Sequence, residues 1–172
     1  YLIANNSVTK NHVVDFAGTA YLREYDYKKA IEWFKKAGAA EELNIHTNPF
    51  IDITYDRVEP LAEEEKFLLT KTAFAEEMLR LQQAAEKDKD NAAKHYYKMA
   101  LGYYNMTYYG HASQLSQYYR SGADGYRIAA DATAFEKEYY GCFTAEKNFE
   151  KAMNASADKN FKARCLFMMA KC

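Results

Sequence analysis

The chain has 172 residues, of which 49% are hydrophobic and 16% aromatic, so it can bury about 70% of its unfolded surface and is neither fibrous nor disordered. Its 23 Lys and Arg residues nearly balance its 24 Asp and Glu residues, and no run of five like charges occurs, which excludes electrostatic capture of nucleic acid or of an anionic membrane. No apolar run is long enough to span a membrane, and the 7 Gly and 2 Pro residues favour helices joined by short connections.

Two antiparallel helices are predicted near the N-terminus. In the stretch YDYKKAIEWFKKA, the side chains of Ala30, Phe34 and Ala37 fall on one helical face. Gly18 and Tyr21 lie on a preceding amphipathic helix. Because Gly18 and Ala30 are small, we expect the two helices to approach closely, with Tyr21 and Phe34 filling the space beside them.

Residues 41–70 interrupt the helical pattern. Both prolines, Pro49 and Pro60, lie there, and the apolar residues of FIDITYDRV indicate short extended structure. A loop of this length in a helical array is either functional or disordered, and the sequence leaves both open. The following stretch FAEEMLRLQQAAEK is predicted to be a helix.

Two further helical regions follow. One runs from about Asn91 to Tyr109, and the stretch TAEKNFEKAMNAS repeats the spacing of the N-terminal pair with Ala145, Phe149 and Ala152. The last predicted helix, residues 160–172, carries an apolar face that no later helix covers. We therefore expect the native chain to continue past Cys172, or this helix to mediate self-association.

These spacings resemble the tetratricopeptide repeat, a 34-residue pair of helices with Gly or Ala at position 8, Tyr at 11, Ala at 20, Phe or Tyr at 24 and Ala at 27. The N-terminal pair fills all five positions, and the stretch from Ala145 fills the last three. Ala100, Tyr103 and Ala112 fit positions 8, 11 and 20 of a middle unit. The resemblance implies an all-α, right-handed solenoid of about three antiparallel helix pairs, with an irregular insertion around residues 41–70, in a single domain over residues 1–172 of a longer chain.

The segments NPF, YYNMTYYG and KARCLFMMAKC are similar to uncharacterised proteins of Bacteroidetes that contain tetratricopeptide repeats. This resemblance covers most of the chain and implies a periplasmic or outer-membrane-associated location. Some of those proteins carry a Cys and His cluster after the NPF segment, where this chain reads IDITYDRVEP. No metal site is carried over.

In tetratricopeptide arrays, positions 2, 5, 9, 12 and 13 of the first helix line a concave groove. The positions that match in the helix after Asn91 are Lys94, Tyr97, Leu101, Tyr104 and Asn105. A Tyr-rich stripe there would hold an extended peptide or stack on a sugar ring, or else belong to the core.

The same positions of the N-terminal unit carry polar residues. They are His12, Asp15, Thr19, Leu22 and Arg23. Arg23, Arg127 and Arg164 are candidates for binding acidic groups. Asp15 and Thr19 differ from the Lys and Asn that clamp a peptide C-terminus in such repeats, which argues against that mode of binding.

The sequence argues against catalysis. The one candidate cluster is Asp52 and Asp56 near His46, which could meet in a loop. The four His residues are scattered, and metal-ligand spacings, a Gly-rich phosphate loop and a nucleophile elbow are missing, so no cofactor or metal is expected. Three Cys residues are too few for a disulfide framework, and Cys165 and Cys172 are too far apart on one helix to pair. The sequence thus predicts a non-catalytic scaffold that binds a protein or peptide, with a glycan-binding module or a structural spacer as alternatives.

Overall fold

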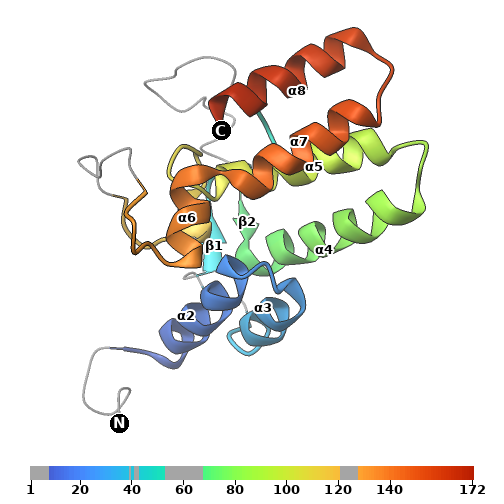
Figure 1. The fold of residues 1–172 in the computed structure, drawn as a ribbon. Coiled ribbons are helices and arrows are strands. Elements are labelled where there is room, and N and C mark those ends of the chain that lie inside the picture. Colours follow the sequence, from blue (N-terminus) through green and yellow to red (C-terminus); the bar gives the residue numbers. More distant parts are fainter. Residues whose placement is uncertain (1–7, 39, 41–42, 53–67, 121–127) are drawn as a thin grey trace.

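The computed structural model describes residues 8–38, 40, 43–52, 68–120 and 128–172. This part of the chain is mostly helical, which confirms the all-α class (Figure 1). The α-helices are α2 Lys10–Arg23, α3 Tyr27–Phe34, α4 Lys71–Lys87, α5 Ala92–Asn105, α6 Ala134–Gly141, α7 Phe143–Asn154 and α8 Lys159–Lys171. A short 3₁₀ helix, η2, spans Ser113–Leu115, and the strands are β1 Asn44–Ile45 and β2 Leu69–Thr70.

The helices pack in chain order. Helix α2 packs on α3, α3 on α4, α4 on α5, α5 on α7 and α7 on α8. In Figure 1 this series runs from the α2–α3 pair at the bottom to α8 at the top, with α6 to one side. Each helix therefore buries its apolar face mainly against its neighbours in the series.

The α2–α3 pair has the predicted close approach. A Cβ atom added to Gly18 would lie 2.2 Å from the Phe34 ring, so only glycine fits there without a shift of the ring. Ala30 and Phe34 are fully buried. Helix α3 begins where the Asp26 carboxylate accepts a hydrogen bond from the backbone N–H of Lys29, at 3.1 Å.

The predicted second helix of the middle unit is wrong. Residues 113–120 form only η2 and then irregular backbone. The Ser116 hydroxyl donates to the carbonyl of Met106 at 2.5 Å, and the backbone N–H of Ala112 donates to Asn105, so this segment folds back on the end of α5. Serine competes for backbone groups in this way, which disfavours helix.

Helix α5 packs against α7 and not against a helix that directly follows it. The chain between α5 and α7 contains η2 and α6. Ala100 of α5 and Ala145, Phe149 and Ala152 of α7 are all buried. Thr133 is the N-cap of α6 and forms a reciprocal capping box with Glu136. The buried small and aromatic residues expected of one repeat therefore come from α5 and α7, two helices that do not follow each other in the chain.

Two short strands lie at the two ends of the irregular region, whereas most of the stretch FIDITYDRV, predicted to be extended, falls outside the described residues. Strands β1 and β2 pair antiparallel, with Asn44 opposite Thr70 and Ile45 opposite Leu69. Residues 53–67 lie outside the described part. The pairing brings the chain before the irregular region next to the start of α4.

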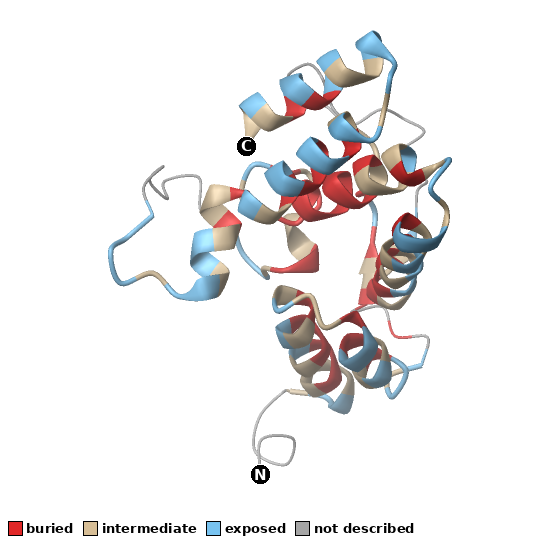
Figure 2. Ribbon diagram, turned by 45° about the vertical axis from the view of Figure 1, so that its right-hand side comes forward, coloured by how far each residue is buried: buried red, intermediate tan, exposed pale blue. Residues whose placement is uncertain are grey.

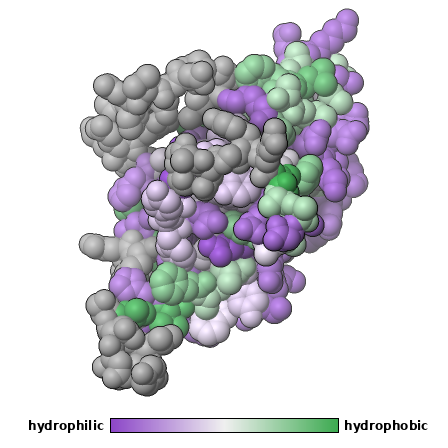
Figure 3. All heavy atoms as spheres, turned by 60° about the vertical axis from the view of Figure 1, so that its left-hand side comes forward, coloured by the Kyte–Doolittle hydropathy of each residue, from purple (hydrophilic) through white to green (hydrophobic). Residues whose placement is uncertain are grey.

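The core follows the inner faces of the stacked helices (Figure 2). Its largest fully buried side chains include Tyr27, Phe34, Phe74 and Phe149. Figure 3 shows one face of the surface, where hydrophilic residues predominate and apolar residues gather in separate areas. Within the described residues, no helix is both long enough and apolar enough to cross a membrane.

Candidate functional site

The predicted Tyr-rich groove on α5 is not open. The exposed fractions of Tyr97, Leu101, Tyr104 and Asn105 are 8%, 3%, 6% and 2%. Of the groove residues predicted on this helix, Lys94 alone is exposed. The prediction of an exposed stripe is therefore wrong, and the alternative that these residues belong to the core is correct.

The chain's own residues 48–52 cover the positions expected to bind a ligand. The Asn105 side-chain amide donates to the carbonyls of Pro49 and Ile51 at 2.9 and 3.0 Å. The Tyr97 hydroxyl donates to the Asp52 carboxylate at 2.6 Å. Asn105 therefore binds the backbone of an internal segment of the chain in the way that it was expected to bind the backbone of a peptide ligand.

Helix α8 completes the burial of this surface. Tyr97 contacts the ring of Phe161 of α8 at a centroid distance of 5.2 Å, beside the ring of Phe149 of α7 at 5.3 Å, and Arg164 of α8 forms an ion pair with Asp52. Burial alone would raise the pKa of Asp52, but hydrogen bonds from Arg164 and Tyr97 lower it overall. Arg164 is therefore engaged within the chain.

The other predicted arginines do not join this surface. Arg23 donates to the Ser116 carbonyl at 2.7 Å and to the Gln117 side chain at 3.3 Å, and its guanidinium lies 4.7 Å from the Phe135 ring centroid. Arg127 lies outside the described residues. The residues predicted to form one binding site are therefore separated: most of the α5 residues are in the core, Lys94 is on the helix surface, and Arg23 lies in a second region around α2.

That second region contains an open pocket of about 430 Å³. We call it the Lys71 pocket. Side chains from α2, β1, the start of α4 and the residues around η2 line it: His12, Asp15, Phe16, Asn44, Lys71, Gln114, Gln117 and Tyr118. His12 and Asp15 are two of the groove positions predicted in the N-terminal unit.

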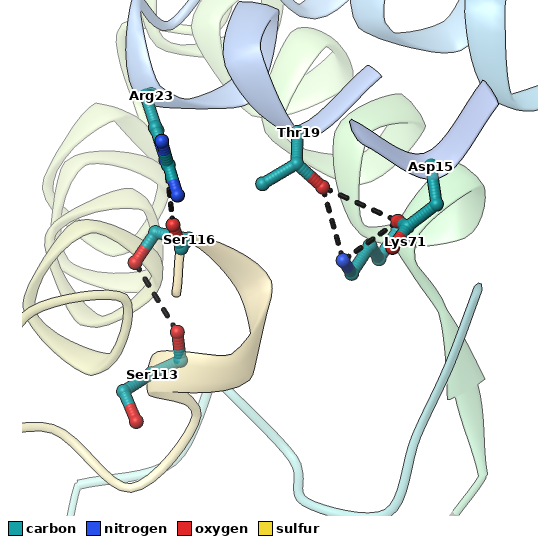
Figure 4. Close-up of polar contacts among 6 residues, drawn as sticks. All are labelled: Asp15, Thr19, Arg23, Lys71, Ser113 and Ser116. Atoms are coloured by element: carbon teal, nitrogen blue, oxygen red, sulfur yellow. Dashed lines mark hydrogen bonds and ion pairs between the residues drawn. The ribbon is translucent and has the colours of Figure 1, made fainter. Parts of the chain in front are cut away.

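Asp15 and Lys71 line one side of the pocket and belong to a buried polar cluster with Thr19 (Figure 4). Lys71 donates to the Asp15 carboxylate at 2.7 Å and to the Thr19 hydroxyl at 3.0 Å, and that hydroxyl donates to Asp15 at 3.2 Å. The three residues are 3%, 4% and 1% exposed. Each charge has a partner, as buried charges require.

The surroundings of Lys71 disfavour its charged form. Burial lowers the pKa of the Lys71 ammonium, and the nearby Arg23 charge adds to this, while Asp15 opposes the shift. The ammonium also lies 4.8 Å from the ring centroid of Tyr118. Burial, with a contribution from the Asp15 charge, raises the pKa of Tyr118, so its hydroxyl stays protonated at neutral pH.

Two aromatic rings and three amides form the rest of the lining. The rings of Phe16 and Tyr118 meet edge to face at a centroid distance of 5.0 Å, and about half of each side chain is exposed. The amides are Asn44, Gln114 and Gln117. A side-chain amide has an NH₂ group that donates hydrogen bonds and an oxygen that accepts them, so this lining suits a ligand with both donors and acceptors.

Sequence reasoning missed Lys71, Tyr118 and the amides. A signal existed for Lys71, because it falls on the same face of α4 as the buried residues Phe74, Met78, Leu81 and Ala85. A lysine at the end of an apolar stripe indicates a buried partner. Tyr118 and the amides carry no such signal, since they reach the pocket only through the fold.

The described residues contain no group of three or more His, Cys, Asp and Glu side chains that could hold a metal ion. No protein-family model, no curated protein and no solved structure matches this chain. The site is therefore interpreted from its own geometry.

Proposed function

We propose that the chain is a non-catalytic binding domain, built as a right-handed tetratricopeptide-like stack of helix pairs, that holds an extended peptide segment of a protein partner in the Lys71 pocket. The observation that carries this proposal is the pocket itself, which opens beside the groove positions of the N-terminal pair. The packing of helices in chain order and the Gly18–Phe34 contact support the architecture.

The chemistry of the pocket favours a peptide backbone. An extended backbone offers alternating N–H donors and carbonyl acceptors, which the amides of Asn44, Gln114 and Gln117 match. The half-exposed rings of Phe16 and Tyr118 provide an apolar contact for one side chain of the ligand.

The ligand segment is internal rather than terminal. Asp15 and Lys71 neutralise each other within 2.7 Å, so neither charge is left to pair with a terminal amine or carboxylate. Peptides with blocked ends should therefore bind as well as peptides with free ends.

A glycan is the second candidate, because aromatic rings and amides also bind sugars. A sugar ring stacks best on a flat aromatic platform, whereas the Phe16 and Tyr118 rings stand 86° apart. The geometry therefore favours the peptide. The third reading, a structural spacer, predicts no ligand.

The test is a selection of random displayed peptides on the wild-type chain, followed by fluorescence anisotropy with blocked peptides and by a glycan array. The Phe16→Ala, Tyr118→Ala double variant removes both half-exposed rings of the pocket. We expect it to bind the selected peptides at least about tenfold more weakly, a loss of about 1.4 kcal/mol. Circular dichroism checks that each variant is folded.

The matched control is Leu166→Ala, Phe167→Ala, which removes two similarly exposed apolar side chains from α8. It should bind as the wild type does. Equal loss in both variants would contradict the assignment of the pocket. Binding to the glycan array alone would favour a glycan as the ligand. Binding to neither peptides nor glycans would favour the role of a structural spacer.

A further inference from the structure

The C-terminal helical pair brings two cysteines together. Cys142 stands between α6 and α7, and Cys172 caps the end of α8. Because only residues 155–158 connect α7 to α8 and the two helices pack together, the start of α7 lies beside the end of α8 (Figure 1). This antiparallel arrangement places two residues that are distant in sequence side by side.

Cys142 belongs to the buried core, and the partly buried Cys172 packs against the same core. The Cys142 thiol also lies 3.4 Å from the Thr107 hydroxyl. All three cysteines are free. The site is therefore a dithiol pair held by three helices and the residues that follow α5.

The backbone fixes the position of Cys142. Its φ angle is 52°, in the left-handed region, and its N–H donates to the Glu138 carbonyl at 2.9 Å. The residue thus ends α6 and starts α7 at once. Its side chain is 1% exposed, whereas Cys172 is partly exposed.

We propose that Cys142 and Cys172 form an intramolecular disulfide, by exchange with a small-molecule or protein disulfide, and that this bond fastens the end of α8 to the start of α7. The Cys172 thiolate, the accessible one, attacks one sulfur of the donor disulfide and releases a first donor thiol. The Cys142 thiolate then attacks the Cys172 sulfur of the mixed disulfide and releases the second. The two cysteines are oxidised by two electrons, and the donor is reduced to two thiols that take up the two protons.

The surroundings shift the pKa values of the two thiols in opposite directions. In the reduced pair the hydrogen bond from Cys172 lowers the pKa of the Cys142 thiol, and the contact with Thr107 adds to this. The same hydrogen bond, with burial, raises the pKa of Cys172, which makes the first step slow. Once Cys172 is in the mixed disulfide it has no proton to donate, so only the Thr107 contact still favours the Cys142 thiolate in the second step. Burial also raises the pKa of Cys165, to about 11, and this fully buried thiol should stay unreacted.

The experiment incubates the reduced chain with mixtures of oxidised and reduced glutathione, then unfolds it in acid-quenched denaturant and blocks free thiols with an alkylating agent. Mass spectrometry maps the cysteine-containing peptides. We expect a single intramolecular disulfide between Cys142 and Cys172, with Cys165 alkylated. The melting temperature of the oxidised chain should rise by roughly 5–15 °C, because the bond closes a loop that contains α7 and α8.

Three variants, each checked for folding by circular dichroism, make the result decisive. Cys165→Ser should oxidise as the wild type does. Cys172→Ser should lose both the disulfide and the rise in melting temperature, and Cys142→Ser should retain glutathione on Cys172. A mixed disulfide that persists on Cys172 of the wild type, a bond that includes Cys165, or a free Cys142 under oxidising conditions would each overturn the proposal.

Discussion

At the scale of single residues, the fold depends on a few glycines that make room for a neighbouring side chain and on buried charges that pair with each other. Gly18 leaves room for the Phe34 ring, and Gly102 leaves room for the Met78 side chain. Lys71 and Asp15 are buried only because they pair with each other. Substitutions at these positions should therefore have large effects that depend on the neighbouring side chain.

Replacing Gly18 with Ala should lower the free energy of unfolding by about 1–3 kcal/mol, because the new methyl group would overlap the rigid Phe34 ring at 2.2 Å. Urea unfolding measures the change. Gly102→Ala is the matched control, since its methyl group would meet the flexible Met78 side chain at 2.6 Å and a ring, that of Phe50, only at 3.2 Å. An equal or larger loss of stability in the control would show that ring contact is not the cause.

Replacing Lys71 with Met should lower the free energy of unfolding by about 3–5 kcal/mol, because Asp15 would stay buried without its partner charge. The double variant Asp15→Asn, Lys71→Met should recover part of this loss. A double-mutant cycle by chemical denaturation measures the coupling. Additive effects of the two substitutions would mean that the pair contributes no coupling energy.

At the scale of elements, neighbouring helices are joined by polar contacts at their surfaces as well as by the core. Glu77 of α4 accepts hydrogen bonds from Arg80 one turn later and from Lys98 of α5, the latter at 2.7 Å. The Arg80 hydrogen bonds, with a further contribution from Lys98, lower the pKa of Glu77 from 4.5 to about 2. This carboxylate therefore links α4 to α5 in a pH-dependent way.

Because the pKa of Glu77 is lower in the folded chain than in the unfolded chain, its contribution to stability is complete above pH 4.5 and is lost as the pH falls toward 2. We expect Glu77→Gln to lower the free energy of unfolding by about 1 kcal/mol at pH 7 and by almost nothing at pH 2. Denaturant titrations across this range measure the difference. Glu86→Gln, on the exposed side of the same helix, is the control, and a difference for Glu77→Gln that stays constant with pH would contradict the assignment.

At the scale of the whole molecule, a few contacts join parts of the chain that are far apart in sequence. Asp52, at the end of the described irregular segment, binds Tyr97 of α5 and Arg164 of α8. The α2–α3 pair lies at the other end of the series of helices. Loss of one such contact should therefore act locally, as in arrays whose units contact only their neighbours.

Replacing Arg164 with Met should increase amide hydrogen exchange about fivefold in α8 and at Ile51 and Asp52, because the half-exposed ion pair contributes about 1 kcal/mol to local stability. Amides of α2 and α3 should exchange at wild-type rates. Native-state exchange followed by mass spectrometry resolves these segments. Uniform acceleration through all helices would indicate that the chain opens only as one unit.

Contacts between neighbouring helices were predictable from the sequence, whereas contacts between distant segments were not. The Gly18–Phe34 contact was predictable because both residues sit at repeat spacing on adjacent helices, and the packing there is local. The α5–α7 pairing was missed, since Ser116 and its neighbours end the expected helix and the true partner lies beyond α6. The Tyr97 stripe was predicted to line an exposed groove, but residues 48–52, from a different part of the chain, help to bury it.

The sequence by itself determined the helical class, the N-terminal helix pair and the absence of recognisable catalytic motifs, because these depend on periodicity and spacing within short stretches. Only the tertiary structure decided that residues 48–52 cover the predicted groove, that Lys71 and Asp15 form one wall of an open pocket, and that Cys142 meets Cys172. These are contacts between residues distant in sequence. Periodicity records which side of a helix is apolar, but which segment covers that side depends on how the helices stack.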